Sequence, residues 1–314
     1  MQRHRLGKTD ITVTPAPFGA MYLGTKQDRE TSFALLDRYV ELGGDFIDTA
    51  NIYAHWVGPE WQGGESETML GEWLRARRNR DRLTITSKVG MPYGKFPMSL
   101  APEIVIAECE ASLKRLGVEC IDLYFAHKDD LTLPQEAVLE TFARLIEAGK
   151  VRAIGASNFA TDRLAVANAL AERSGLPRYE VLQQRFTYLP VRQGADTGRQ
   201  VILTQDMLDY CARDGVSVMA YSVGIGGTYD RYPGVPLPEA FQTAGNEKRM
   251  AVLRSVAREA GCTPGQAVLA WVWSHPGAMP LIAASKIAQL GENMAAMEIR
   301  LSDEQLDHLA RAAE

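Results

Sequence analysis

The chain has 314 residues, of which 46% are hydrophobic and 23% are charged, so it can fold as a globular protein with a large core. Its formal net charge of −5 argues against a nucleic-acid-binding surface, which would be basic. No apolar run approaches the roughly 18 residues needed to span a bilayer, and the N-terminal residues lack the apolar segment of a signal peptide.

Short β-branched or aromatic runs alternate with longer amphipathic segments. The first predicted element is a β-hairpin, with strands at Arg3–Leu6 and Ile11–Thr14. Eight further strands are predicted at Pro17–Gly19, Asp45–Asp48, Thr84–Lys88, Ile121–Ala126, Val151–Ala156, Val181–Gln184, Ser217–Tyr221 and Pro280–Ala283. Helices are predicted at Arg29–Leu42, Ser66–Arg77, Pro102–Leu116, Pro134–Ala148, Thr161–Ser174, Thr204–Arg213, Asn246–Ala260 and Ile287–Met297, with a last helix within Leu301–Ala313.

This alternation predicts the architecture. A regular βα repeat indicates a parallel sheet. Eight such units favour closure into a (β/α)8 TIM barrel, an α/β fold, over an open sheet. We expect the N-terminal β-hairpin to cap the bottom of the barrel and one domain to cover residues 1–314. Three long connections, Ala54–Glu65, Phe186–Leu203 and Ser222–Gly245, are expected at the C-terminal rim, where long loops are usually functional.

Three successive predicted strands end in polar residues of different chemistry. Asp48 closes one strand, Lys88 closes the next, and His127 directly follows the third. Tyr53 lies five residues after Asp48. Because consecutive strand ends are neighbours on the catalytic rim of such a barrel, these four side chains are expected to meet.

Together the four groups form a set for acid catalysis without a nucleophile. An ammonium about 4 Å from a phenolate stabilises it by ~4 kcal/mol at an effective dielectric of 20, or roughly 3 pKa units. Lys88 is therefore expected to lower the pKa of Tyr53 enough for it to donate a proton near neutral pH. Asp48 would hold Lys88, and His127 would polarise the substrate oxygen. This set suits protonation of a carbonyl oxygen while hydride arrives from a cofactor.

Each residue taken alone also fits an ordinary structural role. A strand-end Asp can cap a helix, a Lys can be a surface charge, and a His or Tyr can simply be packed. Their joint occurrence on successive strands favours catalysis. The four cysteines show no CxxC pair, and the histidines have no metal-ligand spacing, so we expect reduced thiols, no metal and a cytoplasmic protein.

Several motifs, in order along nearly the whole chain, resemble those of the aldo-keto reductases. They are Gly44-Asp-Phe-Ile-Asp48-Thr-Ala-Asn-Ile-Tyr53, Gly64-Glu65-Ser66-Glu67, Lys88, Asp122-Leu-Tyr-Phe-Ala-His127, Gly155-Ala-Ser157-Asn158 and Glu292-Asn293. The resemblance implies a nicotinamide cofactor that lies extended across the C-terminal rim and a catalytic tetrad of Asp48, Tyr53, Lys88 and His127. A bacterial member of the family is expected.

The resemblance also implies cofactor contacts. Ser157, Asn158 and Gln183 would bind the carboxamide, and Tyr221, followed by Ser222, would stack on the nicotinamide. The adenosine end would lie on Ser285, Lys286, Gln289, Glu292 and Asn293. Members of the family that use NADP carry basic residues where this chain has Ala283 and Gln289. Lys286 is the remaining cation there, so NADP(H) is favoured over NAD(H).

The substrate is expected to be a small carbonyl, sugar or polyol compound bound by His55, Trp56 and Trp61, because tryptophan stacks on sugar rings and on aromatic aldehydes. The protein would be a monomer or a homo-oligomer, with no nucleic-acid or membrane partner. Three different functions compete with the reductase: a catalytically quiet cofactor-binding regulatory subunit, a polyol or sugar dehydrogenase working in the oxidation direction, and a cofactor-free barrel enzyme with Lys88 as a Schiff-base amine.

Overall fold

Eight parallel strands form the central sheet of the computed structural model, which describes residues 3–94, 96–198 and 200–313. They follow one another in chain order, so that each strand pairs with the next. The strands are β3 (Phe18–Gly19), β4 (Phe46–Asp48), β5 (Thr84–Val89), β6 (Ile121–Ala126), β7 (Val151–Ser157), β8 (Tyr179–Arg185), β9 (Ser217–Tyr221) and β10 (Ala278–Pro280).

The sheet closes on itself just beyond its last strand. Phe18 of β3 forms a parallel bridge with Ile282, two residues after β10. The Gly19 amide donates to the Ile282 carbonyl over 2.8 Å, and the Ile282 amide donates to the Pro17 carbonyl over 2.9 Å. These contacts complete the predicted (β/α)8 barrel.

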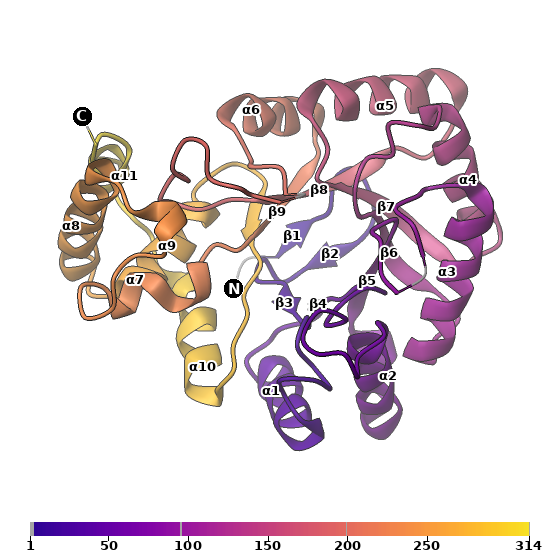
Figure 1. Cartoon of the computed structure of the whole chain (residues 1–314), viewed down its shortest axis with the longest axis horizontal. Coiled ribbons are helices and arrows are strands. Elements are labelled where there is room, and N and C mark those ends of the chain that lie inside the picture. The colour runs from indigo at the N-terminus through magenta and orange to yellow at the C-terminus, as the bar shows by residue number, and fades with distance from the viewer. Residues whose placement is uncertain (1–2, 95, 199, 314) are drawn as a thin grey trace.

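Helices surround the sheet, as the predicted alternation requires. In Figure 1, α1 to α6 follow one another around the barrel, whereas α7, α8, α9 and α11 gather on the other side. Their bounds are α1 (Arg29–Glu41), α2 (Glu65–Arg77), α3 (Pro102–Leu116), α4 (Gln135–Glu147), α5 (Thr161–Ser174), α6 (Gln205–Asp214), α7 (Thr228–Arg231), α8 (Ala244–Glu259), α9 (Pro264–Trp273), α10 (Ile287–Ala295) and α11 (Asp303–Ala310). Among the described residues, no helix is both long and apolar enough to cross a membrane.

The N-terminal hairpin lies at the bottom of the barrel, as predicted. Its strands are β1 (His4–Arg5) and β2 (Thr12–Val13). The Gly7 amide donates to the hydroxyl of Ser217, the first residue of β9, over 2.9 Å. The apolar hairpin residues pack with the barrel interior in one cluster, which contains Leu6, Ile11, Val13, Phe46, Leu123, Phe125, Ala153, Val181, Met219 and Met279. The hairpin thus seals the end opposite the predicted catalytic rim.

Near the C-terminus one predicted strand is shifted along the chain and one helix is present that the sequence does not predict. The eighth strand lies at Ala278–Pro280 rather than Pro280–Ala283. The segment Pro264–Trp273, for which the sequence predicts no regular structure, forms α9. A capping box between Thr263 and Gln266 starts this helix, half of its residues are buried, and none of them is exposed. An apolar helix buried on several sides lacks the alternation of polar and apolar faces that makes a helix visible in sequence.

Strand register brings the predicted polar residues to a common level. Asp48 is opposite Thr86, and Lys88 is opposite Phe125. The His127 amide donates to the Val89 carbonyl over 2.8 Å. Further around the barrel, Ser157 of β7 is opposite Gln183 of β8. The carboxyl ends of five consecutive strands therefore form one rim, from which these side chains start.

Candidate active site

Asp48, Tyr53 and Lys88 form one hydrogen-bonded group at this rim. The Lys88 ammonium lies 2.7 Å from Asp48 Oδ2 and 2.7 Å from the Tyr53 hydroxyl. The Tyr53 hydroxyl lies 3.2 Å from the same Asp48 oxygen. All three side chains are buried. Residues from separate segments of the sequence are therefore in direct contact.

The surroundings of Lys88 identify its charge state. Its Nζ has three acceptors: Asp48 Oδ2, the Tyr53 oxygen, and the Thr49 carbonyl at 2.8 Å. An ammonium has three protons to donate and no lone pair, so three acceptors match its charged form. Burial lowers the pKa of Lys88, and the Asp48 carboxylate opposes this effect. The ion pair with Asp48 is what keeps this fully buried amine protonated.

Asp48 is held by more than its ion pair. Its Oδ1 accepts a hydrogen bond of 2.7 Å from Thr86 and one of 2.9 Å from the Gln183 amide. With Lys88 and Tyr53 on Oδ2, both oxygens of the carboxylate are occupied. Thr86 lies two residues before Lys88, on the same face of β5, and strand periodicity was the signal that could have identified it.

The expected lowering of the Tyr53 pKa is wrong as a net result at this site. Burial raises the pKa of the phenol well above its usual value, and the Asp48 carboxylate raises it further. The expectation included the charge of Lys88 but not the loss of water around the hydroxyl. Tyr53 is consequently a fully protonated phenol at neutral pH.

His127 lies beside Tyr53, with ring centroids 6.0 Å apart in an edge-on arrangement. Burial lowers the pKa of His127 well below its usual value, and the charge of Lys88 lowers it further. The imidazole is therefore neutral near pH 7. Among the described residues, its buried Nδ1 has no hydrogen-bond partner.

A neutral buried histidine makes stability depend on pH. In the unfolded chain His127 takes up a proton near pH 6.5, whereas in the fold it does not. Acidification below about pH 6.5 should therefore lower the free energy of unfolding, by up to ~1.4 kcal/mol per pH unit from this group. We expect the free energy of unfolding of His127→Gln to fall less between pH 7.5 and pH 5.5 than that of the wild type, as measured by urea unfolding at the two pH values. The exposed His308→Gln should keep the wild-type slope, and equal slopes in both variants would contradict a neutral His127.

The residues expected to hold the nicotinamide carboxamide are brought together, and they bond to one another. Asn158 Nδ2 donates to the His127 carbonyl and to Ser157 Oγ, each over 3.0 Å. Asn158 Oδ1 accepts from the Tyr221 hydroxyl over 2.8 Å and from the Val201 amide over 3.1 Å. Gln183 donates to Asp48 instead. Exposed Ser222 follows Tyr221 in the left-handed region, with φ of 60°.

The segment predicted for the adenosine end forms the entrance of α10. Lys286 is its N-cap residue, and no side chain in the described part of the chain caps the first turn. The Gln289 side chain accepts from the Ser285 amide over 3.0 Å, and Asn293 donates to the Ala283 carbonyl over 3.0 Å. The side chains of Gln289 and Asn293 therefore brace the segment itself. Glu292 is exposed one turn into the helix.

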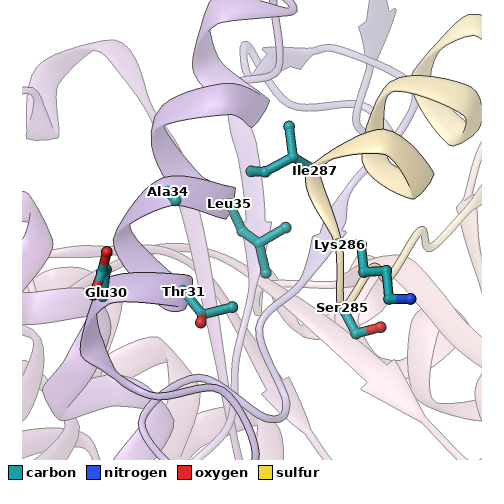
Figure 2. Close-up of a pocket in the computed structure, with 7 residues that line it drawn as sticks. All are labelled: Glu30, Thr31, Ala34, Leu35, Ser285, Lys286 and Ile287. Atoms are coloured by element: carbon teal, nitrogen blue, oxygen red, sulfur yellow. The ribbon is translucent and has the colours of Figure 1, made fainter.

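A cavity of about 290 Å³ lies between this segment and α1. Figure 2 shows Leu35 of α1 and Ile287 between the two elements, whereas the amine of Lys286 points away from α1, on the side of Ser285. Ser285, Lys286 and Ile287 line the cavity on the side of α10, but the amine of Lys286 points away from α1.

Of the residues expected to contact substrate, two lie near the tetrad. Trp56 meets Tyr53 edge-on at 6.4 Å, and His55 meets Trp56 at 5.2 Å. Trp56 is 48% exposed. Trp61 makes no ring contact with Tyr53 or His127 among the described residues. Sequence reasoning missed Tyr93, which continues the row of rings from His55 at 6.4 Å.

Known proteins are similar in sequence to this chain over nearly its whole length. Residues 17–314 match the sequence profile of the aldo/keto reductase family. The chain belongs to the aldo/keto reductase family. It is 31% identical to norsolorinic acid reductase stcV of Emericella nidulans, over 94% of this chain and 77% of the relative. It is 28% identical to aldo-keto reductase ausK of Aspergillus calidoustus, over 95% of this chain and 78% of the relative.

Membership in the aldo/keto reductase family makes the protein an oxidoreductase that uses a nicotinamide coenzyme and acts on carbonyl compounds. The relatives named above are fungal, so they give no support to the expected bacterial origin. In the described part of the chain, no group of three or more His, Cys, Asp or Glu side chains is arranged to hold a metal ion.

Proposed function

We propose that this aldo/keto reductase reduces an aldehyde or ketone to the alcohol with NADPH, and that Tyr53 is the proton donor. The observation that carries the proposal is the contact of the Tyr53 hydroxyl with the Lys88 ammonium, 2.7 Å away. A phenol becomes a useful acid only if the phenolate left behind is stabilised. The ammonium, held in place by Asp48, supplies that stabilisation at the oxygen that needs it.

The residues of the rim fit a nicotinamide dinucleotide. Ser157, Asn158 and Gln183 place amide and hydroxyl groups at neighbouring strand ends, where a carboxamide can exchange with their present hydrogen-bond partners. The uncapped first turn of α10 offers free backbone amides to a phosphate, with Lys286 beside them. A bound reduced nicotinamide supplies the hydride for the carbonyl carbon.

The four catalytic residues act on the substrate oxygen. The Tyr53 hydroxyl donates to Asp48 over 3.2 Å, which is a long and therefore weak hydrogen bond. Little hydrogen-bond energy is lost when the hydroxyl turns to a substrate oxygen. As the proton leaves, the phenolate keeps its hydrogen bond from Lys88. His127, as a neutral imidazole, donates a hydrogen bond to the same substrate oxygen and orients it.

The same catalytic groups serve both directions of the reaction. Reduction uses the protonated Tyr53 as an acid, and its raised pKa favours that form in the free enzyme. Oxidation of an alcohol uses the phenolate as a base. The polyol or sugar dehydrogenase therefore stays the alternative, and the rates in the two directions separate it from the reductase.

A regulatory subunit and a Schiff-base enzyme fit the site less well. A cofactor-binding subunit without catalysis has no use for the buried contact between Tyr53 and Lys88. A Schiff-base enzyme needs a neutral and accessible amine, whereas Lys88 is fully buried and surrounded by three acceptors. Borohydride would trap substrate on Lys88 in a Schiff-base enzyme, whereas it would trap none in the reductase.

The proposed substrate is a carbonyl compound with an apolar or aromatic body. The exposed apolar side chains on the two loops after β4 and β5 include Trp56, Phe96 and Met98. Such surfaces bind flat rings by stacking and burial. A sugar is the second candidate, because His55 adds a polar group beside Trp56.

A substrate panel tests the function directly. We expect NADPH-dependent reduction of 2-naphthaldehyde with a lower KM than that of glyceraldehyde, and slower oxidation of the matching alcohols. If the protein turns over none of these compounds with NADPH or NADH, the proposed reductase activity is contradicted.

Coenzyme choice should depend on Lys286. A charge-assisted hydrogen bond is worth roughly 1.5–3 kcal/mol, or about 10- to 150-fold in Kd. Lys286→Ala should weaken NADPH by about that factor and leave NADH nearly unchanged, as measured by quenching of tryptophan fluorescence. The exposed Lys114→Ala on α3 serves as the control. Equal weakening of both coenzymes would mean that Lys286 does not contact the 2′-phosphate.

A further inference from the structure

A second buried polar cluster lies behind the tetrad, between the strands and helices α2 and α3. Its members are Asn51, Glu67, Ser87, Tyr93, Glu108 and Arg115, which we call the α2–α3 cluster. None of them has a part in the reaction as proposed above. Two of its members are nevertheless close in sequence to catalytic residues: Ser87 directly precedes Lys88, and Asn51 lies two residues before Tyr53.

Glu108 connects the cluster to the loop of Tyr53. This carboxylate of α3 is only 5% exposed. Its Oε2 accepts hydrogen bonds from Asn51 Nδ2 over 2.9 Å and from the hydroxyl of Tyr93. Asn51 lies two residues before Tyr53, and its own Oδ1 is buried without a partner among the described residues. The bond to Glu108 is therefore what orients the Asn51 side chain.

Glu67 connects the cluster to the strand of Lys88. This buried carboxylate of α2 accepts from the Ser87 hydroxyl and from Arg115 Nε, the latter over 2.6 Å. Side chains alternate along a strand, so that Lys88 faces Asp48 inside the barrel while Ser87 reaches the helices. The cluster thus holds the neighbours of both Tyr53 and Lys88.

The loop that leads from Tyr53 into α2 packs closely on the same cluster. Gly63 and Gly64 have φ of 94° and 90°. A Cβ on Gly63 would lie 2.6 Å from the Tyr93 ring, and a Cβ on Gly64 would lie 2.5 Å from the Arg115 side chain. Only glycine permits this close approach.

The backbone next to Tyr53 requires such support. Ala54 has φ of 72°, in the left-handed region, where a residue with a Cβ is strained. Strained backbone persists when surrounding contacts over-determine it. Two contacts flank Ala54 in the sequence. Asn51 on one side is bonded to Glu108, and Gly63 on the other side packs on Tyr93.

We propose that Tyr93 and Glu108 are positioning residues, which fix the loop of Tyr53 so that its hydroxyl stays on Lys88 and reaches the substrate oxygen. The inference rests on the proposed role of Tyr53. Small displacements of a reacting group lower the rate steeply, so loss of this support should lower kcat rather than coenzyme affinity.

Tyr93→Phe tests the proposal, because it keeps the ring under Gly63 and removes only the hydroxyl. We expect kcat to fall about 10- to 100-fold, with the coenzyme Kd within about twofold of wild type. The matched control is Tyr124→Phe, a buried tyrosine whose hydroxyl has no partner among the described residues. This control should keep the wild-type kcat.

The double variant Tyr53→Phe, Tyr93→Phe shows whether Tyr93 positions Tyr53 or only stabilises the fold around it. If Tyr93 acts through Tyr53, Tyr93→Phe should have little further effect on kcat once the Tyr53 hydroxyl is gone. A full additional loss would overturn the proposal, as would a kcat of Tyr93→Phe within twofold of wild type.

If Tyr93→Phe fails to fold, Asn51→Ser is the second test. It removes the other hydrogen-bond donor to Glu108. The same fall in kcat at unchanged coenzyme Kd supports the proposal, and wild-type kcat overturns it. An inactive Tyr53→Phe with a fully active Tyr93→Phe overturns this inference alone. An active Tyr53→Phe overturns the proposed function as well.

Discussion

Replacing Tyr53 by Phe should lower kcat by at least ~10², the scale of one general acid, while the coenzyme Kd changes little. The variant keeps the ring and its packing against His127 and Trp56, so only the proton donor is lost. The Asp48 and Lys88 pair stays intact, because the phenol is only one of three acceptors around the ammonium.

Single-turnover reduction at saturating coenzyme would measure this effect on the chemical step itself. Tyr124→Phe removes a hydroxyl elsewhere in the barrel and serves as the control. Retained activity of Tyr53→Phe would point to another acid, with His127, whose ring lies beside that of Tyr53, as the first candidate.

Lys88→Met should abolish most activity and also destabilise the fold. Methionine leaves the Asp48 carboxylate buried without a counter-ion, and removing one partner of a buried pair costs about 3–5 kcal/mol. Thr86 and Gln183 still donate to Asp48, so we expect the lower end of this range. Urea unfolding and kcat measured on the same preparation would give both effects.

A double variant isolates the contribution of the ion pair. Asp48→Asn together with Lys88→Met removes both charges and should be less destabilised than the sum of the single variants. Lys114→Met, at an exposed position on α3, controls for the substitution. Wild-type rates in Lys88→Met would show that the ammonium is not coupled to the acid.

The sequence predicts the barrel and the positions of the four polar residues well, because both follow from local patterns. Apolar runs such as Ile121–Ala126 are strands in the structure with the predicted bounds. The parallel register then brings Asp48, Lys88 and His127 to one rim without further information. Helix α9 was missed because its burial removes the periodicity on which prediction depends.

What the sequence does not reveal is the partner of a buried polar group. Glu108 lies 57 residues from Asn51, and no local pattern connects them. The expected direction of the Tyr53 pKa was wrong for a related reason, since desolvation depends on how tightly the fold encloses the hydroxyl. Trp61 was grouped with Trp56 by proximity in sequence, but only Trp56 lies against the ring of Tyr53.

The side chain of Asn158 is saturated, since it uses two donors and two acceptors on four protein partners. An amide ligand that bonds to it must displace one of them, so recognition here is an exchange in which the net gain is the difference between two hydrogen bonds. Release of Val201 would free the loop after β8 at one of its anchors, whereas release of Tyr221 would free a ring at the end of β9. A ligand donor that takes the place of either partner on the Asn158 oxygen therefore changes the contacts of a rim loop or of an aromatic ring.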